Sequence, residues 1–222
     1  TLVTRGDKML RSYDQEIVER LCAISVEKGI DIRFNFPFQS ITKQSDGSLL
    51  VDGGKGGAIE TDLVLFAIGR VPKTADLGLE TAGVALDDAG AVIVDDHNKT
   101  NVDSIYAVGD VTNRVQLTPV AIREGHAFAD TVFGNTPRTV DYDCIPSAVF
   151  SQPPLAGVGL TEGQARNKLG SIKVYSSDFR PMKNVLAGRN ERSLYKMIVD
   201  EASDRVVGLH MIGPDAPEIL QA

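Results

Sequence analysis

A glycine and an aspartate end a short apolar run at Gly109 and Asp110, within the sequence SIYAVGDV. The run at residues 105–108 is too short for a helix and has the β-branched and aromatic content of a buried strand. The pair therefore falls at the carboxyl end of a predicted strand, where open α/β sheets bind ligands. Glycine lets a ligand approach the backbone there, and the carboxylate can accept hydrogen bonds from sugar or polyol hydroxyls. The alternative is an ordinary turn.

A second candidate is the predicted helix start at Thr118 and Pro119. Thr118 is predicted to be the N-cap, with Pro119 in the first turn. The unsatisfied amides and positive end of such a helix favour an anionic ligand, or one that becomes anionic, by about 0.3–1 kcal/mol. A well-capped helix without a ligand is the alternative.

A third candidate is the basic group Arg5, Lys8 and Arg11, which follows the apolar residues Leu2 and Val3. If residues 2–4 form the second strand of a dinucleotide-binding βαβ unit, arginine at its end would bind the 2′-phosphate of NADP. The alternative is a solvated basic surface, which the spacing alone slightly favours.

The remaining candidates for chemistry are two cysteines and three histidines. Cys22 falls on the apolar side of a predicted helix, and Cys144 has no base beside it in the sequence. The two cysteines form no close pair, so neither a disulfide nor a metal site is predicted. His210 alternates within a predicted strand and is expected to be structural. No nucleophile is accompanied by a base, and no catalytic residue is assigned.

The composition argues against some classes of function, namely general nucleic-acid binding and insertion into a membrane. The 222 residues carry a formal net charge of -7, which argues against a general nucleic-acid surface because phosphate binding needs concentrated basic charge. No apolar segment reaches the roughly 20 residues that cross a bilayer. With two separated cysteines, the reducing cytoplasm is the default compartment. The first residues lie within an apolar run and the last ones begin a helix, so we expect a fragment of a longer protein.

Hydrophobic periodicity predicts the elements that position the candidates. Ile17, Leu21 and Ile24 indicate one face of a helix that is capped by Ser12 or Asp14. Gly29 is predicted to end this helix. A β-meander is predicted next, with strands in residues 31–34, 38–43 and 49–51.

The middle of the chain is predicted to contain central strands. The continuously apolar run at residues 63–68 predicts a strand buried on both faces, and residues 105–108 predict a second central strand. The segment between them, residues 71–103, is predicted to be an excursion with one strand near residues 91–94. The helix from Thr118 is predicted to stop at Gly134, and a domain boundary is predicted near Tyr142.

The remaining sequence predicts an α+β module. Thr161 and Gln164 have the spacing of a capping box for a helix that stops at Gly170. The segments RVVGLHMIG and SLYKMIVD are predicted to form an antiparallel hairpin, and the other predicted strands are AVF and IKVYSS.

Five motifs along the chain resemble, in order, those of the glutathione reductase branch of the pyridine nucleotide-disulfide oxidoreductases. They are TRGDKMLRSYD, DLVLFAIGRVPKT, TNVDSIYAVGDVTNRVQLTPVAIREG, AVFSQPPLAGVGLTE and DFRPMKNVLAG. The resemblance implies an α/β and α+β fold, in which part of a Rossmann-like NAD(P)/FAD two-domain fold precedes part of an α+β dimerisation domain. Residues 1–70 would end the NADPH-binding domain, 71–143 would form the second part of the FAD-binding domain, and 144–222 would begin the dimerisation domain.

The resemblance also implies ligand contacts at individual positions. FAD would be bound by Gly109, Asp110, Leu117, Thr118 and Arg70. NADPH would be bound by Arg5, Arg11, Gly69, Gln116 and Ala148. The disulfide substrate would meet Phe179, Met182 and His126. Some family members carry an arginine at the position of His126, so that contact differs here.

The activity implied by the resemblance is NADPH-dependent reduction of glutathione disulfide through FAD and a redox-active cysteine pair, in a cytoplasmic homodimer. The cysteine pair, both GxGxxG loops and a C-terminal His-Glu pair are absent from these 222 residues, so this chain alone should not turn over. A reductase of trypanothione or another small disulfide is the nearest alternative. NADH-linked dihydrolipoamide dehydrogenases are disfavoured by Arg5 and Arg11. A non-catalytic assembly module is an alternative of another class.

Overall fold

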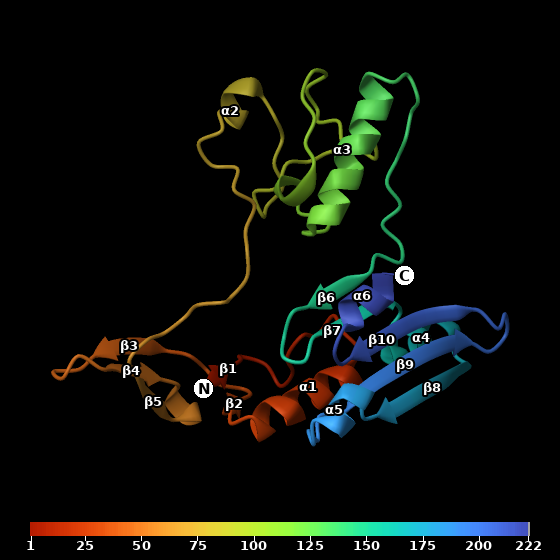
Figure 1. Cartoon of the computed structure of the whole chain (residues 1–222). Helices are drawn as coiled ribbons and strands as arrows, with labels where there is room; N and C mark the ends of the chain where they lie inside the picture. The colour runs from red at the N-terminus through yellow and green to blue at the C-terminus, as the bar shows by residue number, and fades with distance from the viewer. Residues whose placement is uncertain (222) are drawn as a thin grey trace. The chain divides into compact units, whose positions relative to one another are not determined.

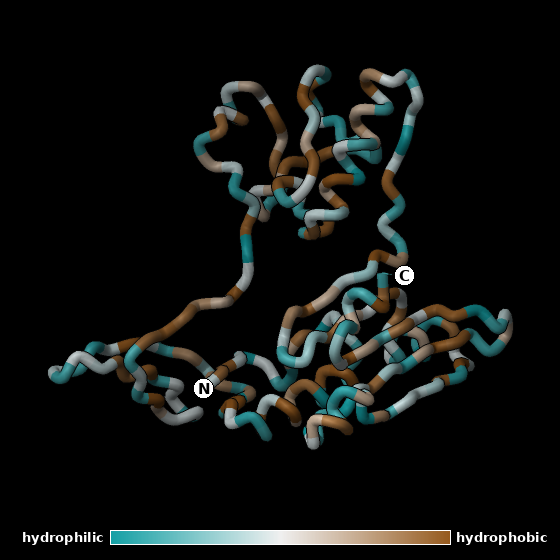
Figure 2. The backbone as a smooth tube through the Cα atoms, viewed as in Figure 1, coloured by the Kyte–Doolittle hydropathy of each residue, from teal (hydrophilic) through white to brown (hydrophobic). Residues whose placement is uncertain are grey.

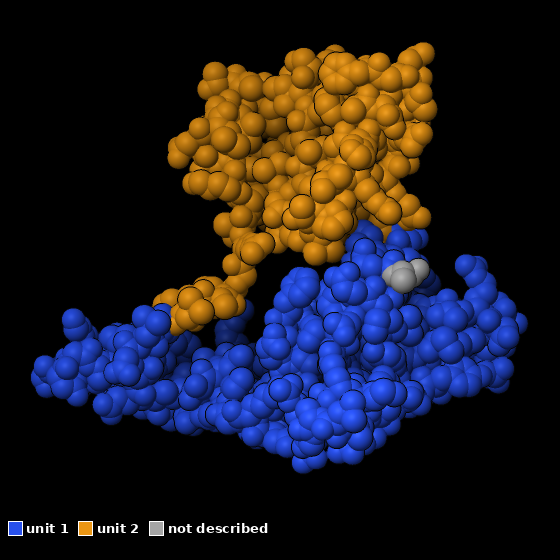
Figure 3. Space-filling view, in the orientation of Figure 1, with its two compact units in different colours: residues 1–64, 143–222 blue, residues 65–142 orange. Residues whose placement is uncertain are grey.

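The computed structural model describes residues 1–221, which form two compact units. One unit combines residues 1–64 with residues 143–221, and the other is Leu65–Tyr142 (Figure 3). No helix within the described residues is long and apolar enough to cross a membrane.

The first unit begins with a βαβ arrangement. Strands β1 (Leu2–Val3) and β2 (Ile32–Arg33) pair in parallel, and helix α1 (Gln15–Glu27) connects them (Figure 1). The predicted helix is confirmed, with Asp14 at its N-cap and Gly29 just beyond its end at φ 90°. The residues after Val3 therefore lie at the carboxyl end of a parallel strand, which is the position that the sequence predicts for nucleotide binding.

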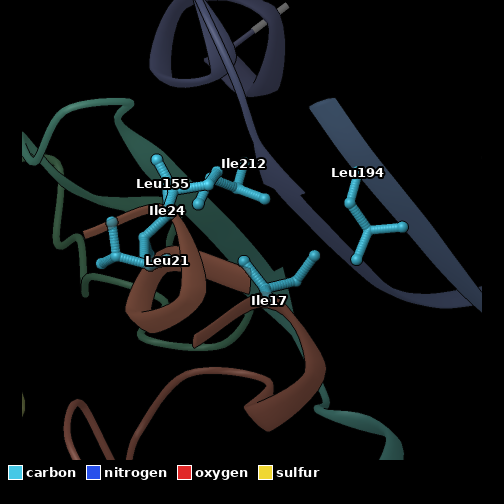
Figure 4. Close-up of a cluster of buried hydrophobic side chains, with 6 residues drawn as sticks. All are labelled: Ile17, Leu21, Ile24, Leu155, Leu194 and Ile212. Atoms are coloured by element: carbon cyan, nitrogen blue, oxygen red, sulfur yellow. The ribbon is translucent and has the colours of Figure 1, made fainter. Parts of the chain in front are cut away.

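Helix α1 buries its apolar face against the C-terminal sheet. Figure 4 shows Ile17, Leu21 and Ile24 from the helix pointing toward side chains of three strands. The strand residues of this cluster are Leu155, Leu194 and Ile212, all at most 4% exposed. Burial of apolar side chains at this scale, about 1.5–3 kcal/mol for each large one, fixes the helix on the sheet.

That sheet has five antiparallel strands in the order β6-β7-β10-β9-β8. The strands are β6 (Ser147–Val149), β7 (Leu155–Gly159), β8 (Ile172–Phe179), β9 (Ser193–Asp200) and β10 (Val206–Ile212). The helices of this part are α4 (Glu162–Leu169), α5 (Met182–Leu186) and α6 (Ala216–Gln221). The β9–β10 hairpin and the capping box of Thr161 and Gln164 are confirmed. His210 is buried in β10, and its Nε2 lies 2.9 Å from the Leu160 carbonyl oxygen.

The predicted meander is a three-stranded antiparallel sheet. Its strands are β3 (Ser40–Lys43), β4 (Leu49–Asp52) and β5 (Ala58–Thr61), with a 3₁₀ turn, η1 (Gly54–Gly56), before the last. The sequence predicts β3 and β4, but the prediction that residues 31–34 begin the meander is wrong, because β2 pairs in parallel with β1 and the unexpected β5 is the third strand. Phe36, which is 2% exposed, packs beside Gly53, where a Cβ would overlap its ring.

The prediction of a buried strand at residues 63–68 is wrong for this structure. This stretch has no strand pairing, and its side chains are exposed except for the half-buried Val64, with Leu65 at 85% and Ile68 at 84%. Figure 2 shows it as a run of hydrophobic colour that follows β5. A strand needs a paired neighbouring strand to satisfy its amides and carbonyls in a ladder, and residues 63–68 lie outside the three sheets of the described residues.

The second unit contains α2 (Leu79–Ala82), the 3₁₀ turn η2 (Gly109–Thr112) and α3 (Thr118–Val132). The strands predicted at residues 91–94 and 105–108 are absent among its described residues. Each region makes one isolated bridge instead, Leu86 to Val92 and Lys99 to Tyr106. The chain folds back locally at both places, so the apolar residues pair within a loop rather than within a sheet. The predicted α3 is confirmed and ends two residues before Gly134.

Candidate functional site: a glycine-aspartate turn beside a helix start

Gly109 and Asp110 form the first residues of η2, in a tight and well-bonded turn. Gly109 has φ 74°, a left-handed conformation that glycine adopts without strain. The Thr112 hydroxyl donates to the Gly109 carbonyl oxygen at 2.9 Å, and the Asn113 amide donates to the Asp110 carbonyl oxygen at 3.1 Å. Gly109 is buried while Asp110 is exposed. The hydrogen bonds therefore hold the backbone of the buried Gly109, and the exposed Asp110 carboxylate is accessible to a ligand.

The start of α3 lies against this turn. A Cβ built at Gly109 would be 3.1 Å from the Ala121 Cβ, so the glycine permits this close approach. The predicted cap is wrong by one residue, because Leu117 is the N-cap, Thr118 is the first helical residue and Pro119 is the second. Thr118 is exposed, and its amide has no hydrogen-bond partner among residues 1–221. The turn and the helix start thus lie side by side, as the sequence predicts.

A buried glutamate of α3 connects these two features. Glu124 is 1% exposed, and its Oε2 accepts the Gly109 amide hydrogen at 2.5 Å. Its Oε1 accepts the Tyr142 hydroxyl hydrogen at 2.6 Å, and the Tyr142 oxygen accepts a hydrogen from Arg114 at 3.0 Å. Burial raises the pKa of the Tyr142 hydroxyl, and the carboxylate of Glu124 raises it further. Both carboxylate oxygens are therefore paired, as a buried charge requires.

Arg114 completes the network on the loop side. Its Nη2 donates to the carbonyl oxygens of Val94 at 2.9 Å and Asp95 at 2.5 Å, and its guanidinium lies 5.6 Å from the centre of the Tyr142 ring. Sequence reasoning missed Glu124, Tyr142 and Arg114. The available signal was the position of Glu124 on the buried face of an amphipathic helix, between Val120 and Ala127.

The two predicted phosphate ligands lie near the end of β1. Arg5 is the second residue after the strand, and Arg11 lies in the turn before α1; both are exposed. The Arg11 guanidinium lies against Gly6, where any Cβ would overlap it. Arg11 also lines a hollow of about 410 Å³ together with Asp14 and Lys196. The structure therefore places both arginines at the carboxyl end of a parallel strand.

The other predicted cofactor contacts are dispersed. Gln116 lies in the loop between η2 and α3, where its Nε2 donates to the Asn113 Oδ1 at 2.9 Å. Gly69, at φ 122°, and Arg70 are exposed in the second unit, and Ala148 lies in β6 of the first unit. Of these residues, Gln116 lies closest in the chain to Asp110, in the loop that follows η2.

The three predicted substrate contacts lie in separate elements. Phe179 ends β8 and stacks edge-on against Tyr195, with ring centres 5.0 Å apart. Met182 begins α5 and is 80% exposed. His126 is exposed on α3 and lines a hollow of about 260 Å³ together with Arg123.

The described residues contain no cluster of three or more His, Cys, Asp or Glu side chains that could hold a metal ion. Cys22 and Cys144 are both free thiols. Burial raises the pKa of the Cys22 thiol, and the charge of Glu19 adds to the shift. A thiol with a raised pKa is a poor nucleophile at neutral pH, so Cys22 is not activated for chemistry.

Comparison with known proteins gives matches along the whole chain. Residues 1–125 match the family model described as pyridine nucleotide-disulphide oxidoreductase, and residues 145–222 match the model of its dimerisation domain. A glutathione reductase of Burkholderia cepacia is 49% identical over 98% of this chain, and a chloroplastic/mitochondrial glutathione reductase of Pisum sativum is 48% identical over the same share. A trypanothione reductase of Trypanosoma congolense is 43% identical over 100% of the chain.

A solved structure gives the same result for the fold. The HOCl-induced flavoprotein disulfide reductase RclA of Escherichia coli covers 99% of this chain with a TM-score of 0.91 at 30% identity. The present chain spans 50% of that protein and between 39% and 48% of the three relatives compared by sequence. The family models and these relatives agree, and the chain belongs to the pyridine nucleotide-disulphide oxidoreductase family.

Proposed function

We propose that this chain is part of an NADPH-dependent, FAD-containing reductase of glutathione disulfide. The observation that carries the proposal is the Gly109–Asp110 turn beside the start of α3, in a chain 49% identical to a glutathione reductase. The family uses FAD and NAD(P)H and reduces small disulfides. The choice of NADPH and of glutathione disulfide is the part that we propose.

The residues at the turn fit FAD. The exposed Asp110 carboxylate can accept hydrogen bonds from the polyol chain, and the unpaired Thr118 amide can donate to the pyrimidine edge of the flavin. Leu117 and Gly109 would form the wall between them, and Arg70 would lie near the ring. When bound, the flavin passes electrons from the nicotinamide to a disulfide. The positive end of α3 would stabilise negative charge at the ring edge.

Arg5 and Arg11 would provide the preference for NADPH. Both follow β1 of the βαβ unit, where the ribose end of a dinucleotide binds. A guanidinium offers paired donors that match a phosphate, and it would leave the hydroxyl of NADH without a comparable partner. Gly69, Gln116 and Ala148 would lie toward the nicotinamide.

Thiol-disulfide exchange would be carried by residues outside these 222. Cys22 and Cys144 are free and far apart in the sequence, and neither is accompanied by a base. We therefore expect this chain alone to be inactive and the full-length protein to act as a cytoplasmic homodimer, in which Phe179, Met182 and His126 meet the substrate. The match of residues 145–222 to a dimerisation domain supports the dimer.

A trypanothione reductase is the second candidate, since one such enzyme is 43% identical over the whole chain. The test is a steady-state assay of the full-length protein with NADPH and each disulfide in turn. The proposal predicts a higher kcat/KM for glutathione disulfide. A higher value for trypanothione disulfide would replace the proposed substrate, and no NADPH oxidation with either would contradict the proposed activity.

A further inference from the structure

A buried lysine of the C-terminal sheet forms ion pairs with three carboxylates at the starts of two helices. Lys196 lies in β9 with its side chain 2% exposed. Its Nζ lies 3.0 Å from Asp14, 2.8 Å from Glu16 and 2.7 Å from Glu162. Burial alone would lower the pKa of Lys196, but these three hydrogen bonds raise it above its ordinary value. The lysine is therefore a fixed positive charge beneath the starts of α1 and α4.

Asp14 is the partner that depends most on this charge. Its side chain is 3% exposed; one oxygen pairs with Lys196, and the other accepts the Glu162 amide hydrogen at 3.0 Å. Burial opposes its ionisation, yet the Glu162 amide and Lys196 hold the pKa of Asp14 below its ordinary value. Asp14 is the N-cap residue of α1 but makes no side-chain capping bond. Its carboxylate therefore ties the helix start to the sheet instead of capping the helix.

The residues immediately before Asp14 form the turn that carries Arg11. Leu10 has φ 45°, its carbonyl oxygen accepts the Tyr13 amide hydrogen at 2.9 Å, and the Gln15 side chain donates to the Tyr13 carbonyl oxygen at 3.0 Å. From this turn the Arg11 guanidinium extends back over Gly6 at the end of β1. Arg11 therefore lies between Gly6, against which its guanidinium rests, and Asp14, in a turn whose Leu10 and Tyr13 also pack against the core cluster.

We infer that Lys196 is a positioning residue for coenzyme preference: through Asp14 it holds the turn that presents Arg11 to the 2′-phosphate of NADPH. The inference rests on the proposed phosphate role of Arg5 and Arg11. Lys196 lies in the segment that matches the dimerisation domain, whereas Asp14 and Arg11 lie in the segment that matches the oxidoreductase model. The preference for one coenzyme thus depends on a residue that does not touch the nucleotide.

The test is Lys196→Met in the full-length protein, with affinity for adenosine 2′,5′-bisphosphate and for AMP measured by calorimetry. We expect affinity for the bisphosphate to fall about tenfold, equivalent to about 1.4 kcal/mol, while AMP binding changes less than about twofold. The KM for NADPH should rise similarly, with the KM for NADH and kcat nearly unchanged. Arg5→Leu with Arg11→Leu provides the reference for full loss of phosphate recognition.

Two further variants separate positioning from stability. Lys196→Met leaves the buried Asp14 carboxylate without its cation. The double variant Lys196→Met with Asp14→Asn removes that charge as well, and it replaces the single variant in the test if the single variant does not fold. Lys173→Met, at an exposed lysine of β8, is the matched control and should bind both nucleotides normally.

The outcomes distinguish the positioning role of Lys196 from the proposed phosphate role of Arg5 and Arg11, on which it rests. Normal preference for the bisphosphate in the folded Lys196 variants would overturn the positioning role and leave the proposed function intact. An equal loss of affinity for both nucleotides would also overturn it. If the unmodified protein itself showed no preference, the phosphate role of the arginines would fail, and the inference with it.

Discussion

At the scale of single residues, Glu124 is the side chain on which the Gly109 turn depends most directly. A buried carboxylate destabilises the fold unless both oxygens are hydrogen-bonded. The Gly109 amide and the Tyr142 hydroxyl donate these two hydrogen bonds to Glu124. The phenol in turn is bonded to Arg114, whose other donors meet the loop carbonyls. The network therefore holds the backbone next to Asp110, whose exposed side chain lies outside the network.

Glu124→Ala is expected to release the Gly109 amide. The variant leaves a buried donor and the Tyr142 hydroxyl without an acceptor, a cost of about 2–3 kcal/mol. Amide hydrogen exchange of a peptide containing Gly109, measured by mass spectrometry on the full-length protein, should speed up at least about tenfold. Glu124→Gln keeps one acceptor and should show a smaller change, and Arg123→Ala on the exposed face of α3 should show none. Unchanged exchange in Glu124→Ala would contradict the role of Glu124 in holding the Gly109 turn.

Local rules of the sequence lead to Asp110 and Thr118, although residues 105–108 form no strand and Leu117 is the N-cap, and the ligand roles of these residues stay predictions. Asp110 after an apolar run and the Thr118–Pro119 pair both follow rules of spacing, and the structure places them beside each other. Glu124 and Arg114 could not be found in this way, because their partners Gly109, Tyr142 and the Val94 carbonyl are brought to them by tertiary folding.

At the scale of elements, ion pairs supplement the apolar packing of α1 on the C-terminal sheet. Asp178 of β8 meets Arg20 of α1 at 2.6 Å and Arg192 at 2.6 Å. Hydrogen bonds from Arg20 and then Arg192 lower the pKa of Asp178 to about 2 from an ordinary value of 3.8. Because its side chain is 40% exposed, each pair is worth about 1 kcal/mol or less.

The pH dependence of this contact follows from the lowered pKa. A carboxyl with a lower pKa in the folded state stabilises the fold above the unfolded value, and this contribution disappears as the pH falls through the folded value. The difference in thermal midpoint between the unmodified protein and Asp178→Asn should be present at neutral pH and shrink between pH 3.8 and about 2. Asp88→Asn, at an exposed acid, should show no such difference. A constant difference across this window would contradict the assignment.

The elements differ in how far the sequence predicts them. Helices α1, α3 and α4 carry their own periodicity and end signals, so Gly29 and Gly170 mark their ends correctly. Strands depend on strand partners, and the apolar run at residues 63–68 belongs to none of the sheets of the described residues. Strand β7 was missed because its sequence, LAGVG, is short and rich in small residues, and its five-residue pairing with β10 is what defines it.

At the scale of the whole molecule, the chain matches the oxidoreductase model over residues 1–125 and the dimerisation-domain model over residues 145–222. The net charge of the chain is -7, whereas Arg5 and Arg11 are both basic residues that follow β1. The chain spans less than half the length of the three relatives compared by sequence. The activity of the complete enzyme therefore has to be tested on the full-length protein.

The affinity of the full-length protein for FAD, with and without Asp110→Ala, tests the central claim most directly. Titration of FAD into apoprotein, followed by flavin fluorescence, should show tight binding to the unmodified protein and binding at least about tenfold weaker to the variant, as loss of a charge-assisted hydrogen bond predicts. Asp88→Ala should bind FAD normally. Equal affinity in Asp110→Ala, or no FAD binding by the unmodified protein, would contradict the assignment of this turn as a flavin nucleotide site.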